Sequence, residues 1–157
     1  SMEIQKMGVH GALYYFTMVH YGRKGHKYLL CGSSMPVALD GVTQFKIRIG
    51  AKPYLKDLPA RQRYFLIPTG NDPSAMIALK SNPLFHITGR GLEMAVFIDP
   101  DDLSEKEDFL KLYRRIRCEN VSQVSVYCLN DPEKIAAWSM EENISNIKCL
   151  RYGDPAS

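Results

Sequence analysis

The sequence has no apolar stretch long enough to cross a lipid bilayer. None of its apolar runs approaches the ~20 residues that a membrane-spanning helix needs. The N-terminus also lacks the basic-then-apolar layout of a secretory signal, and Ser1-Met2 is interpreted as a cloning remnant ahead of the natural start. We therefore expect an intracellular protein, cytoplasmic or nuclear, without a membrane partner.

Cysteine pairs at metal-binding or redox spacing are also missing. The chain has four Cys residues, and no two of them form a CxxC motif: Cys31, Cys118, Cys128 and Cys149. A chain of 157 residues typically buries about two thirds of the surface that it exposes when unfolded, so it needs no disulfides to fold. We expect four reduced thiols, no metal and no cofactor.

The overall composition is that of an ordinary globular protein, with 45% apolar and 24% charged residues. Collagen-like, low-complexity and disordered classes are excluded by these proportions. The chain shows no internal repeat and no linker long or polar enough to divide it. The sequence therefore predicts a single domain over residues 1–157.

The clearest pattern lies in the C-terminal third, where strand-like and helix-like segments alternate. An apolar strand over 94–98 runs into Asp99-Pro100-Asp101-Asp102, and Ser104 with Glu107 forms a capping box that begins a helix reaching about Cys118. A β-branched strand follows at 121–129, Asp131-Pro132 starts a short helix, and a last strand covers 144–150. This order predicts a parallel βαβαβ unit with right-handed crossovers.

The N-terminal part instead indicates antiparallel strands. Residues 12–19 are apolar on both alternating faces, and a Gly-containing loop leads from them into 27–31, which together predict a β-hairpin. Phe45, Ile47 and Ile49 alternate with polar residues, a pattern typical of a half-buried strand with one basic face.

Shorter elements complete the prediction before residue 92. Strands are expected over 63–67 and 84–88, with a short helix over roughly 73–81 between them. The predicted fold class is thus α/β, a mixed sheet in which an antiparallel N-terminal hairpin joins the parallel C-terminal βαβαβ unit.

Charge is divided unevenly between a basic half, 3–92, and an acidic half, 93–152. Residues 1–92 hold twelve cations and four anions, a net charge of +8, whereas 93–157 hold eight cations and thirteen anions, a net charge of −5. A surface rich in Lys and Arg binds phosphate backbones by ion pairing and counterion release. Tyr21, Tyr28, Tyr54 and Tyr64 interleave with these cations and suit stacking on unpaired bases.

The leading hypothesis is therefore an intracellular nucleic-acid-binding domain, for DNA or RNA, that acts through a basic N-terminal face. An acidic protein would suit the same surface. The candidate contact residues are the cations of the predicted hairpin tip and of the basic strand, with their neighbours: Arg23, Lys24, Lys27, Lys46, Arg48, Lys52, Arg61 and Arg63.

Two alternatives remain open. The first is a protein-interaction or assembly module. It would associate with other proteins, or with further copies of itself as a homo-oligomer, through apolar surface or a free strand edge. The second is a metal-dependent phosphoryl-transfer or phosphodiester-cleaving enzyme that uses Asp99 and Asp101, because carboxylates after a parallel strand are a usual place for Mg²⁺. No catalytic residue is assigned, since Asp beside Pro also makes ordinary turns and caps.

One triplet resembles a known enzyme signature. His86-Ile87-Thr88 matches one half of the paired H-x-T motif of the two-histidine phosphoesterases. Those enzymes need two such triplets, one histidine as base and the other as acid, and a second is absent from this sequence. His86 is therefore expected to be a partly buried strand residue.

Overall fold

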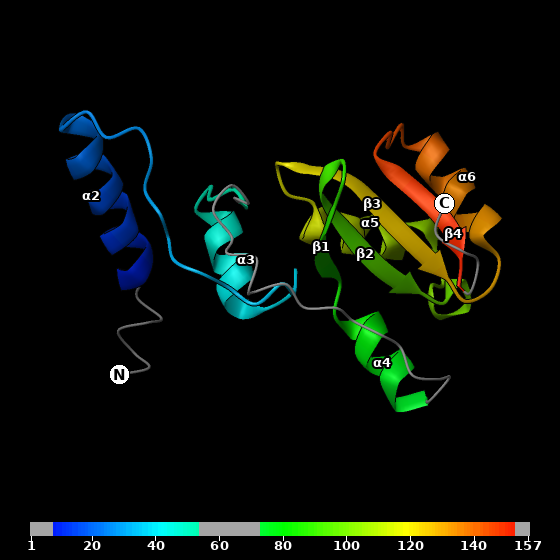
Figure 1. The fold of residues 1–157 in the computed structure, drawn as a ribbon. Coiled ribbons are helices and arrows are strands. Elements are labelled where there is room, and N and C mark those ends of the chain that lie inside the picture. The colour runs from blue at the N-terminus through cyan, green and yellow to red at the C-terminus, as the bar shows by residue number, and fades with distance from the viewer. Residues whose placement is uncertain (1–7, 54–72, 153–157) are drawn as a thin grey trace.

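A four-stranded mixed sheet forms the centre of the computed structural model, which describes residues 8–53 and 73–152. The strand order is β1-β2-β3-β4 (Figure 1). β1 (Leu84–Thr88) pairs antiparallel with β2 (Gly91–Ile98). β3 (Val121–Cys128) and β4 (Ile147–Arg151) each run parallel to the preceding strand. The α/β class and the mixed sheet are thus confirmed.

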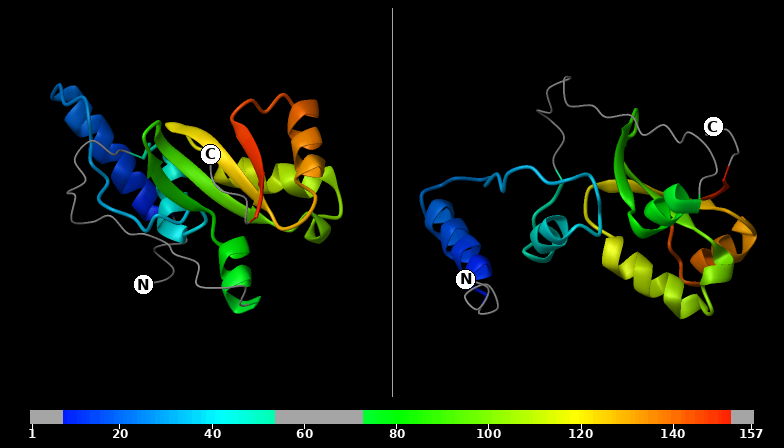
Figure 2. Two further views of the ribbon diagram at one scale, coloured as in Figure 1. Left: turned by 45° about the vertical axis from the view of Figure 1, so that its right-hand side comes forward. Right: turned by 90° about the horizontal axis from the view of Figure 1, so that it is seen from below.

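Two helices connect the parallel strands and cover one face of the sheet. α5 (Lys106–Ile116) links β2 to β3, and α6 (Pro132–Glu141) links β3 to β4. Both lie on the same side of the sheet (Figure 2), as expected when successive right-handed crossovers progress in one direction. Asp131 caps α6 by accepting a hydrogen bond from the Lys134 amide at 3.3 Å, as the Asp131-Pro132 pattern predicted.

The hydrophobic core lies between this face and the two helices. β2 and β3 contribute alternate residues, including Met94, Val96 and Val126, and α5 and α6 contribute Phe109 and Ile135. α5 confirms the helix that was expected to reach about Cys118, and it begins two residues after Ser104. The predicted capping box is wrong, however, because Glu105 is the N-cap residue and no side chain caps this helix.

The remaining helices precede the sheet. α4 (Pro73–Ser81) confirms the helix expected over 73–81, and it contacts β2. The expected strand over 63–67 lies outside the described residues, as do the candidate cations Arg61 and Arg63 and the tyrosines Tyr54 and Tyr64. Within 8–53 and 73–152, no helix is long and apolar enough to cross a membrane.

The predicted N-terminal hairpin is wrong. Residues 12–19 lie in the helix α2 (Val9–Arg23), and 27–31 form no strand. An apolar segment without a polar face has no periodicity, so alternation alone does not distinguish a strand from a helix. The antiparallel partner in the mixed sheet is β1 instead.

The predicted basic strand around Phe45 is also wrong, because the segment is the helix α3 (Gly41–Arg48). Its start is set by Asp40, whose Oδ2 accepts hydrogen bonds from the amides of Val42 and Thr43 at 3.0 Å each. This N-cap signal was present in the sequence and outweighs three alternating apolar residues.

Candidate functional site

The first group of candidate cations lies at the C-terminal end of α2. Arg23 is the last residue of the helix, Lys24 is its C-cap, and Lys27 follows in the exposed segment that leads toward α3. None of the three forms an ion pair with a described acidic residue. Tyr21 and Tyr28 are exposed beside them. The end of α2 is therefore strongly cationic and carries aromatic side chains.

The α3 cations are in different environments. The Lys46 ammonium donates hydrogen bonds to the carbonyls of Gly32 and Ser33, each at 2.8 Å, so this side chain holds the preceding segment against α3. Arg48 is exposed. Lys52 forms an ion pair with Glu119 across an open surface, with 54% and 72% of the two side chains exposed. The candidates thus separate into an α2 group and an α3 group.

The structure brings α3 beside the C-terminal end of α5. Gln44 of α3 joins them, because its Nε2 donates to the carbonyl of Arg115 at 3.0 Å as well as to that of Ala38 at 2.7 Å. The neighbouring ends of the two helices border a pocket of about 360 Å³. We call it the α3–α5 pocket; its lining includes Lys52, Arg117 and Glu119.

The other walls of the α3–α5 pocket are partly polar. The Tyr113 hydroxyl donates to Oδ1 of Asn146 at 2.9 Å, which connects α5 to the start of β4. Cys118 also lines the pocket, and burial raises the pKa of its thiol to about 11, so the thiol stays protonated at neutral pH. Sequence reasoning missed Arg117, since this residue belongs to the acidic half of the chain.

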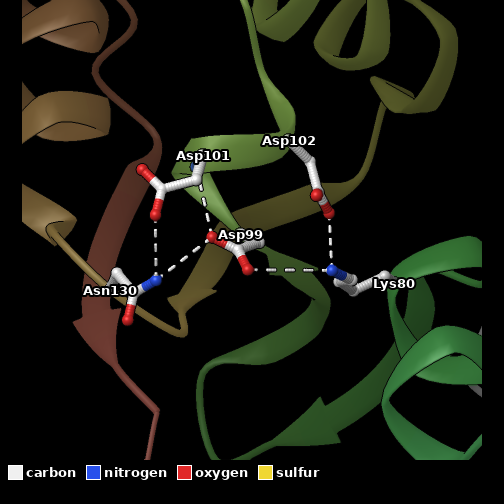
Figure 3. Close-up of polar contacts among 5 residues, drawn as sticks. All are labelled: Lys80, Asp99, Asp101, Asp102 and Asn130. Carbon is white, nitrogen blue, oxygen red and sulfur yellow. Dashed lines mark hydrogen bonds and ion pairs between the residues drawn. The ribbon is translucent and has the colours of Figure 1, made fainter. Parts of the chain in front are cut away.

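A second polar cluster lies where β2 and β3 end. The side-chain Nδ2 of Asn130 donates hydrogen bonds to the carboxylates of Asp99 and Asp101, at 3.3 Å and 3.2 Å (Figure 3). Lys80, from α4, reaches the cluster from the other side, with its ammonium 2.5 Å from the Asp102 carboxylate and 3.9 Å from that of Asp99.

These contacts have a structural explanation. Asp99 caps the 3₁₀ helix η2 (Pro100–Asp102) by accepting from the Asp101 amide at 3.1 Å. Lys80 ties α4 to η2, and Asn130 ties the β3–α6 connection to it. Among the residues that the structure describes, no group of three or more acidic, His or Cys side chains is placed to hold a metal ion. The cluster thus joins α4, η2 and the β3–α6 connection at one end of the sheet.

A polar row crosses the sheet face opposite α5 and α6. His86, Glu93 and Gln123 are neighbours in register on β1, β2 and β3. Oε1 of Glu93 accepts from the Thr88 hydroxyl at 2.8 Å and from Nε of Arg90 at 3.0 Å, and this side chain is only 2% exposed.

The titration of this row follows from its burial. Burial acts to raise the pKa of the Glu93 carboxyl, but the hydrogen bonds from Thr88 and Arg90, with the charges of Arg90 and His86, outweigh it and hold that pKa below its ordinary value. The pKa of His86 is lowered by burial, which exceeds the opposing effect of Glu93. Nε2 of His86 is buried and has no hydrogen-bond partner among the described residues.

Comparisons with protein families, with curated proteins and with solved structures found no significant match for this chain. Function is therefore argued from the chain's own residues.

Proposed function

We propose that the protein binds the phosphate backbone of nucleic acid through the cations around the α3–α5 pocket and at the end of α2. One observation carries the proposal: α3 and the C-terminal end of α5, distant in the sequence, border a single pocket lined by Lys52 and Arg117. Cations from both halves of the chain thereby add to one surface, which the division by sequence halves did not anticipate.

The charges at this surface are available to a ligand. Arg117 lines the pocket, and Arg48 directly follows the lining residue Ile47 in α3. Both are exposed and pair with no described carboxylate. The Lys52–Glu119 pair is exposed, and such a pair contributes only about 0–1 kcal/mol, so a phosphate can displace Glu119 at little cost. Guanidinium groups suit phosphate oxygens because their donors form a planar fork.

The α2 group extends the same function. Arg23, Lys24 and Lys27 offer three more positive charges, and the exposed rings of Tyr21 and Tyr28 suit stacking on unpaired bases. Five exposed cations without a described acidic partner are then available: Arg23, Lys24, Lys27, Arg48 and Arg117. If each contacts one phosphate of a single strand, log affinity should fall with log salt concentration with a slope near −0.7 × 5, or roughly −3.5.

The test compares two double charge reversals with equal net charge. Arg48→Glu with Arg117→Glu changes the α3–α5 side, whereas Lys111→Glu with Arg151→Glu changes cations elsewhere on the molecule. Each reversal removes two charge units, so both variants bring the net charge from +3 to −1. Binding of a labelled single-stranded oligonucleotide is measured by anisotropy between about 50 and 200 mM salt.

We expect the α3–α5 variant to lose affinity at least tenfold at 50 mM salt and to show a shallower salt slope by about 1.4. The control variant keeps the slope of the wild type. Equal losses in both variants would mean that net charge alone attracts the oligonucleotide. No binding by the wild type at 50 mM salt would refute the proposal outright.

A further inference from the structure

α2 is a helix whose side chains are largely uncovered. It has 15 residues, and none of them is buried. Between Val9 and Gly22 the sequence contains no Asp, Glu, Lys or Arg. Leu13 and Phe16 are 62% and 66% exposed, and Val9 is also exposed. Burying apolar side chains removes them from water and stabilises a protein, so α2 has a strong tendency to be covered.

The properties of α2 indicate what kind of surroundings would cover it. A helix that is apolar on all sides is usually buried within protein or lipid, since it has no polar face to leave in water. At 1.5 Å per residue α2 is about 22 Å long, shorter than the ~30 Å hydrocarbon core of a bilayer. Its surroundings are therefore expected to be protein.

Within its own chain, α2 uses a different side. Tyr14 packs edge-on against Phe45 of α3 with 5.6 Å between ring centroids. Val9, Leu13, Phe16 and His20 follow each other at helical spacing and form one stripe, which lies on the side of α2 away from Tyr14. In the ribbon view α2 stands apart from the sheet (Figure 1). The stripe thus remains open.

The stripe contains a hollow with the geometry of a helix-packing site. A pocket of about 390 Å³ on α2 is lined by Phe16, Val19, His20, Arg23 and Lys24. The first four stand at i, i+3, i+4 and i+7, which is the spacing of the four residues that receive one side chain of a facing helix in knobs-into-holes packing. Val9 and Leu13, on the same stripe, are apolar side chains of the kind that fill such a hollow.

We propose that α2 pairs with the α2 helix of a second copy of this chain, antiparallel and related by a two-fold axis. The Val9 and Leu13 side chains of each copy then enter the hollow of the other. A two-fold dimer needs one patch that complements itself, and this stripe carries both the hollow and the side chains to fill it. The axis passes between Leu13 and Phe16, so that Leu13 faces Phe16 and Val9 faces His20.

The charge distribution favours the antiparallel arrangement. Arg23 and Lys24 follow the apolar part of the helix at one end only. A parallel pair would bring both cationic ends together, whereas the antiparallel pair separates them by about 25 Å along the axis, well beyond the ~8 Å screening length at physiological salt. No charged side chain within 9–22 is buried by the contact.

The stripe leaves apolar surface open for a contact, because Val9, Leu13 and Phe16 are 44%, 62% and 66% exposed. An aromatic side chain buries about 200 Å², so the exposed part of the Phe16 ring alone offers about 130 Å².

The first test measures mass by light scattering at about 100 μM protein. We expect a dimer of twice the 17.8 kDa chain mass for the wild type. Leu13→Glu with Phe16→Glu should give a monomer with an unchanged circular dichroism spectrum. Tyr15→Glu is the matched control, because Tyr15 is 60% exposed but lies off the stripe. A monomeric wild type, or a dimer that survives the double substitution, would overturn the proposal.

The second test fixes the orientation by disulfide formation in chains that carry Cys31→Ser. In the antiparallel pair, Val9 of one copy lies about 16 Å along the axis from Val9 of the other, too far for a disulfide. Val9→Cys alone should therefore remain uncross-linked, whereas a mixture of the Val9→Cys and His20→Cys variants should form a cross-linked heterodimer. Efficient self-cross-linking of Val9→Cys would contradict the antiparallel arrangement.

The dependence of the dimer on salt distinguishes an apolar contact between α2 helices from an ionic contact and from nucleic-acid binding. An apolar contact persists in 1 M sodium chloride, whereas binding of the cationic α2 end to the acidic half of another copy would be lost there. Loss of the dimer at high salt overturns the proposal. Leu13→Ser with Phe16→Ser removes the apolar side chains without changing any charge, so loss of the dimer in this variant is separable from loss of nucleic-acid binding.

Discussion

Substitution of the buried Glu93 provides the most direct test of the polar row on the sheet. Glu93→Gln keeps the shape of the side chain and its acceptor for Thr88 and Arg90, and it removes only the negative charge. The pKa of Glu93 lies below its ordinary value, which means that these contacts favour the ionised form by more than burial disfavours it. The neutral variant is therefore expected to be less stable.

The magnitude follows from the two hydrogen bonds. A hydrogen bond to a charged group contributes about 1.5–3 kcal/mol and a neutral one about 0.5–1.5 kcal/mol. Desolvation of the carboxylate offsets part of the difference. The Arg90 side chain is 62% exposed, so water also weakens its interaction with the Glu93 carboxylate. A net loss of about 1 kcal/mol remains, which lowers Tm by about 2–4 °C for a chain of this size.

The pH dependence gives the sharper readout. A carboxyl whose pKa is depressed in the fold contributes stability above its unfolded pKa, here near 4.5, and loses it as pH falls through the folded value. The free energy of unfolding, measured in urea, should therefore differ between wild type and Glu93→Gln at pH 7, and the difference should shrink as the pH falls below the unfolded pKa. A difference that does not shrink on acidification would refute the reasoning, as would no difference at pH 7.

The control is Glu119→Gln. Glu119 also pairs with a cation, Lys52, but its side chain is 72% exposed. Water solvates both charges there, so the expected effect is below about 0.5 kcal/mol. An equal effect at both sites would show that burial does not decide the outcome.

Three further predictions follow from burial. His86→Leu removes a buried nitrogen that has no hydrogen-bond partner in the described part of the chain. Because burial lowers the pKa of His86, its neutral form contributes stability that is present above pH 6.5 and lost as the pH falls below it. The free energy of unfolding in urea should therefore differ less between pH 5 and pH 7.5 for the variant than for the wild type. Ile135→Ala should lower the free energy of unfolding by about 2–5 kcal/mol, measured from the urea midpoint, because Ile135 is 0% exposed. A thiol reagent at pH 8 should modify Cys31 first, because burial raises the pKa of the other three thiols to about 11, 12 and 11: Cys118, Cys128 and Cys149.

Local signals explain why the C-terminal part was predictable. The β-branched strand at 121–128 and the Asp131-Pro132 helix start both act through neighbouring residues, and both are confirmed. Ser104 does not cap α5 because the chain remains extended through Glu105, which takes the N-cap position one residue later.

The N-terminal part failed because its pattern was ambiguous. α2 is apolar on every side, so no periodicity distinguished a helix from a strand. For α3 the sequence did contain a decisive signal at Asp40, but the alternation of Phe45, Ile47 and Ile49 was given more weight. That error placed Lys46 and Arg48 on a strand face when they belong to a helix.

The candidate surface depended on contacts between distant segments. The sequence identified Lys52 and Arg48 as candidates, but it could not show that Lys52 lies opposite Glu119 or that Arg117 borders the same pocket. These arrangements arise because Gln44 and its neighbours hold α3 against the end of α5.

The amino-acid sequence by itself determined the parallel βαβαβ unit, the order of its elements and the unequal charge of its halves, because periodicity, capping and composition act locally along the chain. Only the tertiary structure decided which cations share a surface, that Glu93 lies buried beside Thr88 and Arg90, and that α2 stands uncovered. Those properties depend on how segments far apart in the chain pack, and packing energies are set by the whole fold.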